Sequence, residues 1–297
     1  MANLKQLVGT MRPPFLVLTP ICLFLAAMLA NYDGYVLSQA PVVIMLITAL
    51  LAHVAVNTLN EYQDFKSGLD LATEKTPFSG GSGTLPSHPS LANATLKLAI
   101  SAIVLIVVLG LYLAFTTSLL LIPFGIAGVI IVISYTKTLN KLPVLCYLSP
   151  GVGFSIIMIL GSYVAITGTL TPKVLWVALI PFFQVNHLLL LNQFPDVEAD
   201  RTVGRNTFPI HFGEGASIAL YCVSVIIPFL LLAWLLISSQ LPATSFLALF
   251  AMAPAIFAIV GAIKFGFAIG QHTKFLAANV VTCLLTPLLI SIGLLIS

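Results

Sequence analysis

The chain is built from long apolar stretches separated by shorter polar ones. A helix needs about 20 apolar residues to cross the hydrocarbon core of a membrane, with a working range of roughly 17–25. By that criterion the sequence predicts nine membrane-spanning helices and an all-α fold, with residues 1–297 forming one domain. The predicted spans are residues 13–30, 41–60, 91–115, 118–135, 143–166, 174–192, 216–237, 245–263 and 275–297.

Composition indicates the same class. Only 7% of the residues are charged, 59% are apolar and the mean hydropathy is +1.11, whereas a soluble domain carries roughly a quarter charged residues. The solvent of this chain is therefore predicted to be a lipid bilayer. The net charge of +3 gives no indication of a nucleic-acid partner. The first span also lacks the small-residue cleavage pattern of a signal peptide, so we expect it to stay in the protein.

Cysteine and histidine usage does not indicate a soft-metal site. The four cysteines lie in or beside apolar runs, without a Cys-x-x-Cys spacing or a Cys/His cluster, and are predicted to be buried free thiols. His53 and His187 lie within predicted spans and are interpreted as polar residues satisfied between helices. The cysteines are Cys22, Cys146, Cys222 and Cys283.

Positive residues are distributed unequally between the two sides of the spans. If the N-terminus is cytoplasmic, eleven of the twelve Lys and Arg residues fall on the cytoplasmic side and only Lys173 falls outside. This asymmetry follows the positive-inside rule and predicts a cytoplasmic N-terminus with an external C-terminus. The long polar loops, residues 61–90 and 193–215, then lie in the cytoplasm, and loops of this length commonly carry function.

Two acidic segments, residues 60–70 and 192–200, interrupt the apolar pattern. We call them the first and second acidic motifs. Each begins with an asparagine, and an aspartate follows four residues later. Carboxylates beside apolar spans are costly to leave unpaired, so they commonly mark a functional site with a metal or a cationic partner. The two motifs hold most of the nine acidic residues of the chain, which concentrates the candidate chemistry on one side.

The motifs predict a site for a hard cation. On a helix, Asn57, Asn60 and Asp64 share a face because they are three and four residues apart. Pro195 should end the helix before it, because proline removes a backbone donor and disfavours helix in the preceding residue. Oxygen ligands without His or Cys suit magnesium, which binds a few carboxylates with water and substrate phosphates. The candidate ligands are Asn60, Asp64, Asp70, Asp196 and Asp200.

Basic residues near the motifs predict a magnesium-bridged diphosphate as the substrate. Arginine pairs with phosphate oxygens in a bidentate way, and lysine acts as a point charge. The glycine-rich run at residues 79–83 would either donate backbone N–H groups to an anion or form a flexible lid. Solvated helix caps, with basic loops set only by membrane orientation, are the simpler alternative. The nearby cations are Lys66, Lys75, Lys137, Lys141, Arg201 and Arg205.

The matched motifs also suggest an internal duplication. Each one closes an even-numbered predicted span, the second and the sixth. The spacing therefore predicts two four-helix halves in the same orientation, followed by a ninth helix. Such a repeat would be parallel rather than inverted.

These residues resemble the UbiA superfamily of intramembrane prenyltransferases. Residues 60–70, with Gly68, match the first signature of its menaquinone-pathway branch, Asn-Asp-Tyr-x-Asp-x-x-x-Gly-x-Asp, except that Glu61 stands where aspartate is commoner. Residues 192–201, followed by Gly-Arg-Asn-Thr at 204–207 and by Gly213, match the second signature. Further matching pairs are Arg12-Pro13 before the first span and Tyr135-Thr136 after the fourth. Residues 148–154 depart from the Gly-Leu-Gly-Glu stretch that many members carry.

The resemblance implies nine helices around a central cavity, covered by cytoplasmic loops, in a prokaryotic plasma membrane. It implies Mg²⁺-dependent transfer of a polyprenyl group from an allylic diphosphate to an aromatic acceptor such as 1,4-dihydroxy-2-naphthoate, in quinone biosynthesis. Asp64, Asp196 and Asp200 would then be catalytic through the metal. Arg12 would face the carboxylate of the acceptor. The other substrate-binding residues would be Asn57, Lys66, Tyr135, Lys137, Asn192, Arg201 and Arg205.

Two other functions are compatible with parts of this pattern. A terpene cyclase of the same superfamily would ionise the same diphosphate without an external acceptor. A secondary transporter would also have many spans and an internal repeat, but it usually places broken helices and coupling charges near the middle of the membrane. Here no Asp, Glu, Lys or Arg lies near the centre of a predicted span, which favours the enzyme.

Overall fold

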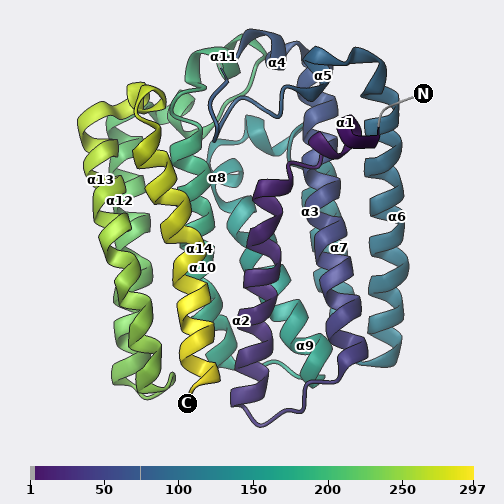
Figure 1. The fold of residues 1–297 in the computed structure, drawn as a ribbon, viewed down its shortest axis with the longest axis vertical. Helices are drawn as coiled ribbons and strands as arrows, with labels where there is room; N and C mark the ends of the chain where they lie inside the picture. The colour runs from purple at the N-terminus through teal and green to yellow at the C-terminus, as the bar shows by residue number, and fades with distance from the viewer. Residues whose placement is uncertain (1–3, 74) are drawn as a thin grey trace.

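The computed structural model describes residues 4–73 and 75–297, and all regular elements within them are helices (Figure 1). Eight helical segments of these residues are long and apolar enough to cross a membrane, which confirms the all-α fold class. They are η1 (Pro13–Val17) with α2 (Leu18–Tyr32), α3 (Gln39–Ser67), η2 (Pro89–Leu91) with α6 (Ala92–Thr116), α8 (Pro143–Gly151) with η4 (Val152–Leu160) and α9 (Gly161–Thr167), α10 (Pro172–Asn192), α12 (Phe208–Ile237), η5 (Ala243–Ala251) with α13 (Met252–Phe265) and η6 (Gly266–Gln271), and α14 (Thr273–Leu295).

The fourth predicted span corresponds to α7 (Leu121–Ser134), a helix of only 14 residues. At 1.5 Å per residue it is about 21 Å long, because turns replace the helix at both of its ends. α1 (Leu4–Gly9) lies at one end of the bundle, and the C-terminal end of α14 lies at the other (Figure 1). This separation requires an odd number of crossings. Among the described residues, α7 therefore completes the nine-helix arrangement that the sequence predicts.

Short helices gather at the end of the bundle where α1 lies (Figure 1). They are α4 (Leu69–Ala72), α5 (Thr84–Ser87) and α11 (Val197–Thr202). We call this the motif end, because both acidic motifs lie there. At the far end Lys173 pairs with Asp33, which also accepts a hydrogen bond of 2.6 Å from Tyr163. The far end thus carries a self-neutralising pair, and the candidate chemistry is concentrated at the motif end.

The first motif lies on a helix that is longer than predicted. The predicted span ended at Asn60, but α3 runs on to Ser67, and Gly68 ends it with a φ of +83°. A left-handed backbone is costly for residues that carry a Cβ, so glycine suits this turn. The turn directs α4 back across the end of the bundle, and Asp70 on α4 lines the same cavity as Asp64 on α3.

The second motif contains the helix break that the sequence predicts. α10 ends at Asn192, residues 193–196 form turns, and Asp196 directly precedes α11. Pro195 cannot donate a backbone hydrogen bond, which explains why the helix stops there. The prediction from Pro195 is therefore confirmed, and it separates Asn192 from the two aspartates that follow.

The fifth span packs closely on α10. Its middle section, η4, is π-helical, a wider winding that is frequent at functional sites. Just before it, the backbone N–H of Gly151 donates to Asn186 on α10 at 2.6 Å, in space that a Cβ at this position would fill. This contact brings the fifth span against α10, and Phe154 on η4 lines the central cavity.

All four cysteines are free, and Cys22, Cys146 and Cys283 are buried. The prediction of free thiols is therefore confirmed.

Candidate functional site

A cavity of about 590 Å³ extends from the motif end into the bundle. Its wall at the motif end is polar and charged, and its wall among the helices is apolar. The polar end is lined by Arg12, Asn57, Asn60, Asp64, Asp70, Lys75, Tyr135, Asn192, Asp196, Asp200 and Arg205. The apolar body includes Ile103, Ile106, Leu113, Phe124, Val129, Val132, Phe154, Ile157, Met158 and Leu188. The cavity can therefore hold a molecule with an anionic head and a long apolar tail.

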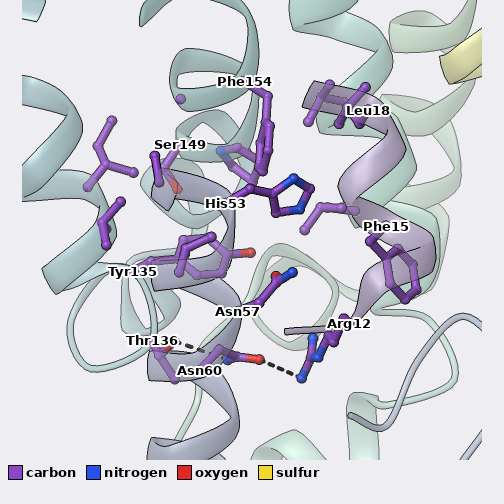
Figure 2. Close-up of a pocket in the computed structure, with 18 of the residues that line it drawn as sticks. Arg12, Phe15, Leu18, His53, Asn57, Asn60, Tyr135, Thr136, Ser149 and Phe154 are labelled. Atoms are coloured by element: carbon purple, nitrogen blue, oxygen red, sulfur yellow. Dashed lines mark hydrogen bonds between the residues drawn. The ribbon is translucent and has the colours of Figure 1, made fainter. Parts of the chain in front are cut away.

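One face of α3 forms a polar column along this cavity, as its three- and four-residue spacing predicts (Figure 2). Asn57 donates from Nδ2 to the backbone oxygen of Met11 at 2.8 Å. Asn60 accepts from Nη2 of Arg12 at 2.8 Å and donates to Oγ1 of Thr136 at 3.0 Å. Both amide groups are thus used to fix neighbouring segments. They hold the N-terminal stretch and the turn after α7 against α3.

Glu61 has a structural function that the sequence did not indicate. It is fully buried and forms an ion pair with Arg12, whose Nη2 lies 2.6 Å from Oε1. The same carboxylate accepts hydrogen bonds from the backbone N–H and the hydroxyl of Ser82, at 2.7 and 2.6 Å. Glu61 therefore ties the N-terminal stretch to the glycine-rich run. The charge of Arg12, predicted to serve an acceptor's carboxylate, is already neutralised by Glu61.

Arg205 joins the two acidic motifs. Its guanidinium donates to Oδ1 of Asp200 at 2.9 Å and also bonds Asp64, so one cation contacts a carboxylate from each motif. Gly204, with a φ of +75°, lets the chain turn after α11, and the backbone N–H of Arg205 then bonds the carbonyl of Asp200 at 3.1 Å. Burial alone would lower the pKa of Arg205, but the two carboxylates raise it, so the guanidinium stays charged.

The other carboxyl groups are held in surroundings that disfavour their charge. Burial, with the charges of Asp64 and Glu61, raises the pKa of Asp70 to about 7. Burial, with the charge of Asp200, raises the pKa of Asp196 to about 7. Burial also raises the pKa of Asp200 to about 6, against the opposing effect of Arg205. A cation bound among these groups would offset this repulsion.

Several buried oxygens in the site lack a hydrogen-bond partner within residues 4–73 and 75–297. They are Oδ2 of Asp70, Oδ1 of Asn192 and Oδ1 of Asp196. Unpaired buried acceptors are costly, so these oxygens are available to a bound water or to a ligand that supplies positive charge. Hard oxygen donors of this kind fit Mg²⁺. Among the described residues, however, no group of three His, Cys, Asp or Glu side chains is arranged to hold a metal ion, and Arg205 is paired with both Asp64 and Asp200.

Three of the predicted substrate-binding cations do not line the cavity. Lys66 is exposed and lies over the ring of Tyr62, Lys137 is exposed, and Arg201 is exposed beside Glu198 at 3.6 Å. Lys75 was named among the nearby cations but not among the substrate-binding residues. It lines the cavity and bonds the carbonyl of Ser82. Its place near the first motif was the only sequence signal.

The two histidines of the spans are hydrogen-bonded between helices, as interpreted from the sequence. Nδ1 of His187 lies 2.8 Å from Oδ1 of Asn279, away from the cavity. Nδ1 of His53 lies 2.9 Å from the hydroxyl of Thr19. The ring of His53 also lines the cavity one turn deeper than Asn57, beside Phe154 at 4.5 Å between ring centroids (Figure 2).

This combination of two acidic motifs at the mouth of an apolar cavity agrees with a match to known proteins. The model of the UbiA prenyltransferase family matches residues 18–266. The chain belongs to the UbiA prenyltransferase family. It is therefore an integral membrane enzyme that transfers prenyl groups. The family predicted from the motifs is confirmed.

Individual relatives agree with the family assignment. The 1,4-dihydroxy-2-naphthoate octaprenyltransferase of Bacillus subtilis (strain 168) is 26% identical over 236 residues, which cover 78% of this chain and 68% of the relative. A solved structure reported for digeranylgeranylglyceryl phosphate synthase has a TM-score of 0.70 at 16% identity, with 100% of both chains covered. A UbiA homolog from Archaeoglobus fulgidus, bound to DMAPP and Mg²⁺, has a TM-score of 0.66 at 13% identity, covering 94% of this chain and 99% of that chain. The two structures establish the shared UbiA fold.

Proposed function

We propose that this UbiA family member transfers a polyprenyl group from an allylic diphosphate to an aromatic acceptor. The observation that carries the proposal is the cavity, in which carboxylates from both motifs and Arg205 lie at the mouth of a long apolar chamber. A diphosphate fits the charged mouth, and a prenyl chain fits the chamber. The transporter is not favoured, because the charged lining is concentrated at the motif end.

The charged mouth would bind the leaving group. Asp64, Asp70, Asp196 and Asp200 would hold Mg²⁺, with Asn192 beside them. When bound, the metal would draw negative charge from the diphosphate and so ease cleavage of the allylic C–O bond. Arg205 and Lys75 would contact the diphosphate oxygens directly, because both cations line the cavity. Arg205 would have to release at least one of its two carboxylates to do so.

The apolar chamber would orient the prenyl chain and exclude water from the reacting carbon. The reaction breaks the bond between that carbon and the diphosphate oxygen and forms a bond to the acceptor ring, which loses a proton. His53 and Asn57 on α3, opposite the ring of Tyr135, border a part of the cavity where a flat ring could lie (Figure 2). We propose this place for the acceptor.

The acceptor we propose is 1,4-dihydroxy-2-naphthoate or a similar bicyclic phenol, which would give the enzyme a role in quinone biosynthesis. The support is the name of the Bacillus subtilis relative, at 26% identity. We also propose that the motif end faces the cytoplasm of a prokaryotic cell, because eleven of twelve Lys and Arg residues would then follow the positive-inside rule.

Mass spectrometry of reaction products tests the proposal. Purified protein in lipid nanodiscs would be given Mg²⁺, geranyl or octaprenyl diphosphate, and either 1,4-dihydroxy-2-naphthoate or 4-hydroxybenzoate. We expect a prenylated naphthoate-derived product whose formation saturates with the acceptor and stops when the metal is chelated. A cyclised hydrocarbon formed at a comparable rate without any aromatic compound would replace the transferase with a terpene cyclase.

A further inference from the structure

Glu214 is an acidic residue that belongs to neither motif. It is exposed near the start of α12, and its Oε1 accepts a hydrogen bond of 2.6 Å from the backbone N–H of Phe267 on η6. Gly213, directly before it, has a φ of +79° and a ψ of 178°, which interrupts the helical backbone of α12 there. A charged acceptor strengthens a hydrogen bond. Glu214 therefore holds η6, the turn between α13 and α14, against the start of α12.

The turn is shaped to receive this carboxylate. Gly266, the first residue of η6, has a φ of +48° and a ψ of −130°, a conformation that residues with a Cβ rarely adopt. A Cβ built on Gly266 would overlap Oε1 of Glu214. Both the backbone of the turn and the room for the carboxylate thus depend on the missing side chain. The contact is a built feature of the turn, although Glu214 is exposed.

The other side of η6 supports the second motif. The ring of Phe267 packs edge-on against the ring of Phe194, with 5.2 Å between the centroids, and Phe194 is buried. A Cβ built on Gly270 would lie 2.9 Å from the Cβ of Pro195. Phe194 and Pro195 directly precede Asp196 in the chain. The turn that carries Asp196 therefore rests on η6.

The position of Asp196 matters because its carboxyl group lines the cavity. Its Oδ1 lacks a hydrogen-bond partner in the described part of the chain, and it is one of the proposed Mg²⁺ ligands. A metal ligand must be held within about 0.5 Å of its productive position. Loss of a group that orients a ligand commonly changes metal affinity by about 10- to 100-fold. A shift of η6 would move this ligand.

We propose that Glu214 is a positioning residue for Asp196. By holding η6, it fixes the turn at residues 193–196 and so sets the affinity of the site for Mg²⁺. This rests on the proposed function, because it assigns an outer support to the proposed metal site. Glu214 itself contacts neither the metal nor the substrates. Its removal should weaken metal binding and leave the apolar chamber unchanged.

Replacement of Glu214 separates the hydrogen bond from the charge. Glu214→Ala should raise the Mg²⁺ concentration for half-maximal turnover by about tenfold, with the KM of the acceptor within about twofold of wild type. Glu214→Gln should stay within about threefold of wild type, because its amide oxygen can still accept from Phe267. Glu198→Ala is the matched control. It removes another exposed carboxylate, from the second motif itself, and should keep the wild-type dependence on Mg²⁺.

Hydrogen exchange of the metal-free protein gives an answer that does not need turnover. Glu214→Ala should raise the exchange rates of peptides covering residues 193–200 and 266–271 by at least about fivefold and leave residues 57–64 on α3 unchanged. Gly270→Ala should have the same effect with Glu214 intact, because its methyl group presses directly on Pro195. Gly215→Ala is the control for this variant, since a Cβ on Gly215 meets nothing within 4 Å.

Two results would overturn the proposal. One is faster exchange confined to residues 266–271, because η6 would then not support the second motif. The other is an equal rise in the Mg²⁺ requirement of Glu214→Ala and Glu198→Ala, which would indicate an effect of charge alone. Failure of the wild-type protein to form product with every donor and acceptor would count against the proposed function, and the exchange rates would still decide the role of Glu214.

Discussion

At the scale of single residues, the carboxylates of the two motifs have very different surroundings. Asp64 and Asp200 are buried and share the guanidinium of Arg205. Asp196 lines the cavity with an oxygen that lacks a partner among the described residues. Glu198, in the same motif as Asp196, is exposed and lies 3.6 Å from the exposed Arg201. The effect of removing a charge should therefore depend on position rather than on membership of a motif.

Asp64→Asn and Asp196→Asn should each lower kcat by roughly a thousandfold or more, because each would remove a charged ligand of the proposed Mg²⁺, which would stabilise the leaving group. The measurement is product formation at saturating Mg²⁺, with size-exclusion profiles to confirm folded protein. Glu198→Gln removes an acidic side chain from the second motif without altering the cavity, so it should keep activity close to wild type. Comparable losses in all three variants would contradict the assignment.

Arg12→Ala should lower the free energy of unfolding by about 3 kcal/mol, because it leaves the fully buried Glu61 without its counter-charge. The double variant Arg12→Ala/Glu61→Gln should recover part of that loss, since a neutral amide can still accept from Ser82. Denaturant unfolding in detergent, followed by circular dichroism, measures both changes. If the double variant were no more stable than Arg12→Ala alone, the loss of a counter-charge for Glu61 would not explain the lower stability of Arg12→Ala.

At the scale of elements, the glycine-rich run is packed against the first motif rather than free in solvent. Ser82 bonds Glu61, and a Cβ on Gly81, whose φ is +71°, would lie 2.8 Å from Oδ1 of Asp70. The run therefore needs glycine both for its backbone and for its approach to a carboxylate of the site. The run is therefore packed in a defined position against the first motif.

Gly81→Ala should reduce kcat/KM by about tenfold or more, because the added methyl group displaces Asp70 or the run itself. Gly168→Ala is the matched control. Gly168 also has a positive φ, +75°, but its Cβ meets nothing within 4 Å, and it lies at the far end of α9. Both variants carry a similar backbone strain of roughly 1–2 kcal/mol. Only Gly81→Ala should lose activity in the steady-state assay, and equal losses would indicate strain alone.

The sequence predicted the helices well because apolar length decides a span, but it could not assign the direction of each side chain. α3 continues beyond the predicted end at Asn60, since its last turns are polar and carry no apolar signal. Lys66 was predicted to bind substrate from its position after Asp64. Residues two apart on a helix face different ways, and Lys66 is exposed. The turn at Gly204 brings Arg205 back to Asp200, which periodicity alone does not reveal.

At the scale of the whole molecule, the two ends of the bundle should lie on opposite sides of the membrane. In a background without the four natural cysteines, exposed single cysteines at Ser67 and Thr202 should react with an impermeant maleimide only from the cytoplasmic side, and one at Gln240 only from outside. The reason is the charge asymmetry of the loops. Labelling of Ser67 and Thr202 from different sides would contradict the shared site. The parallel repeat of two four-helix halves stays a prediction.

The segment before the first span has a consequence for how this enzyme is handled and compared. Arg12 has a φ of +54° and contacts Glu61 and Asn60, although it precedes the part that the family model matches, residues 18–266. A deletion of a dozen residues from the start of the chain, or a fusion partner placed close to them, would remove no span yet would disturb the polar wall of the central cavity, which Arg12 lines. Surveys of variation that begin at the matched part would miss this arginine, and expression tags are better attached after α14.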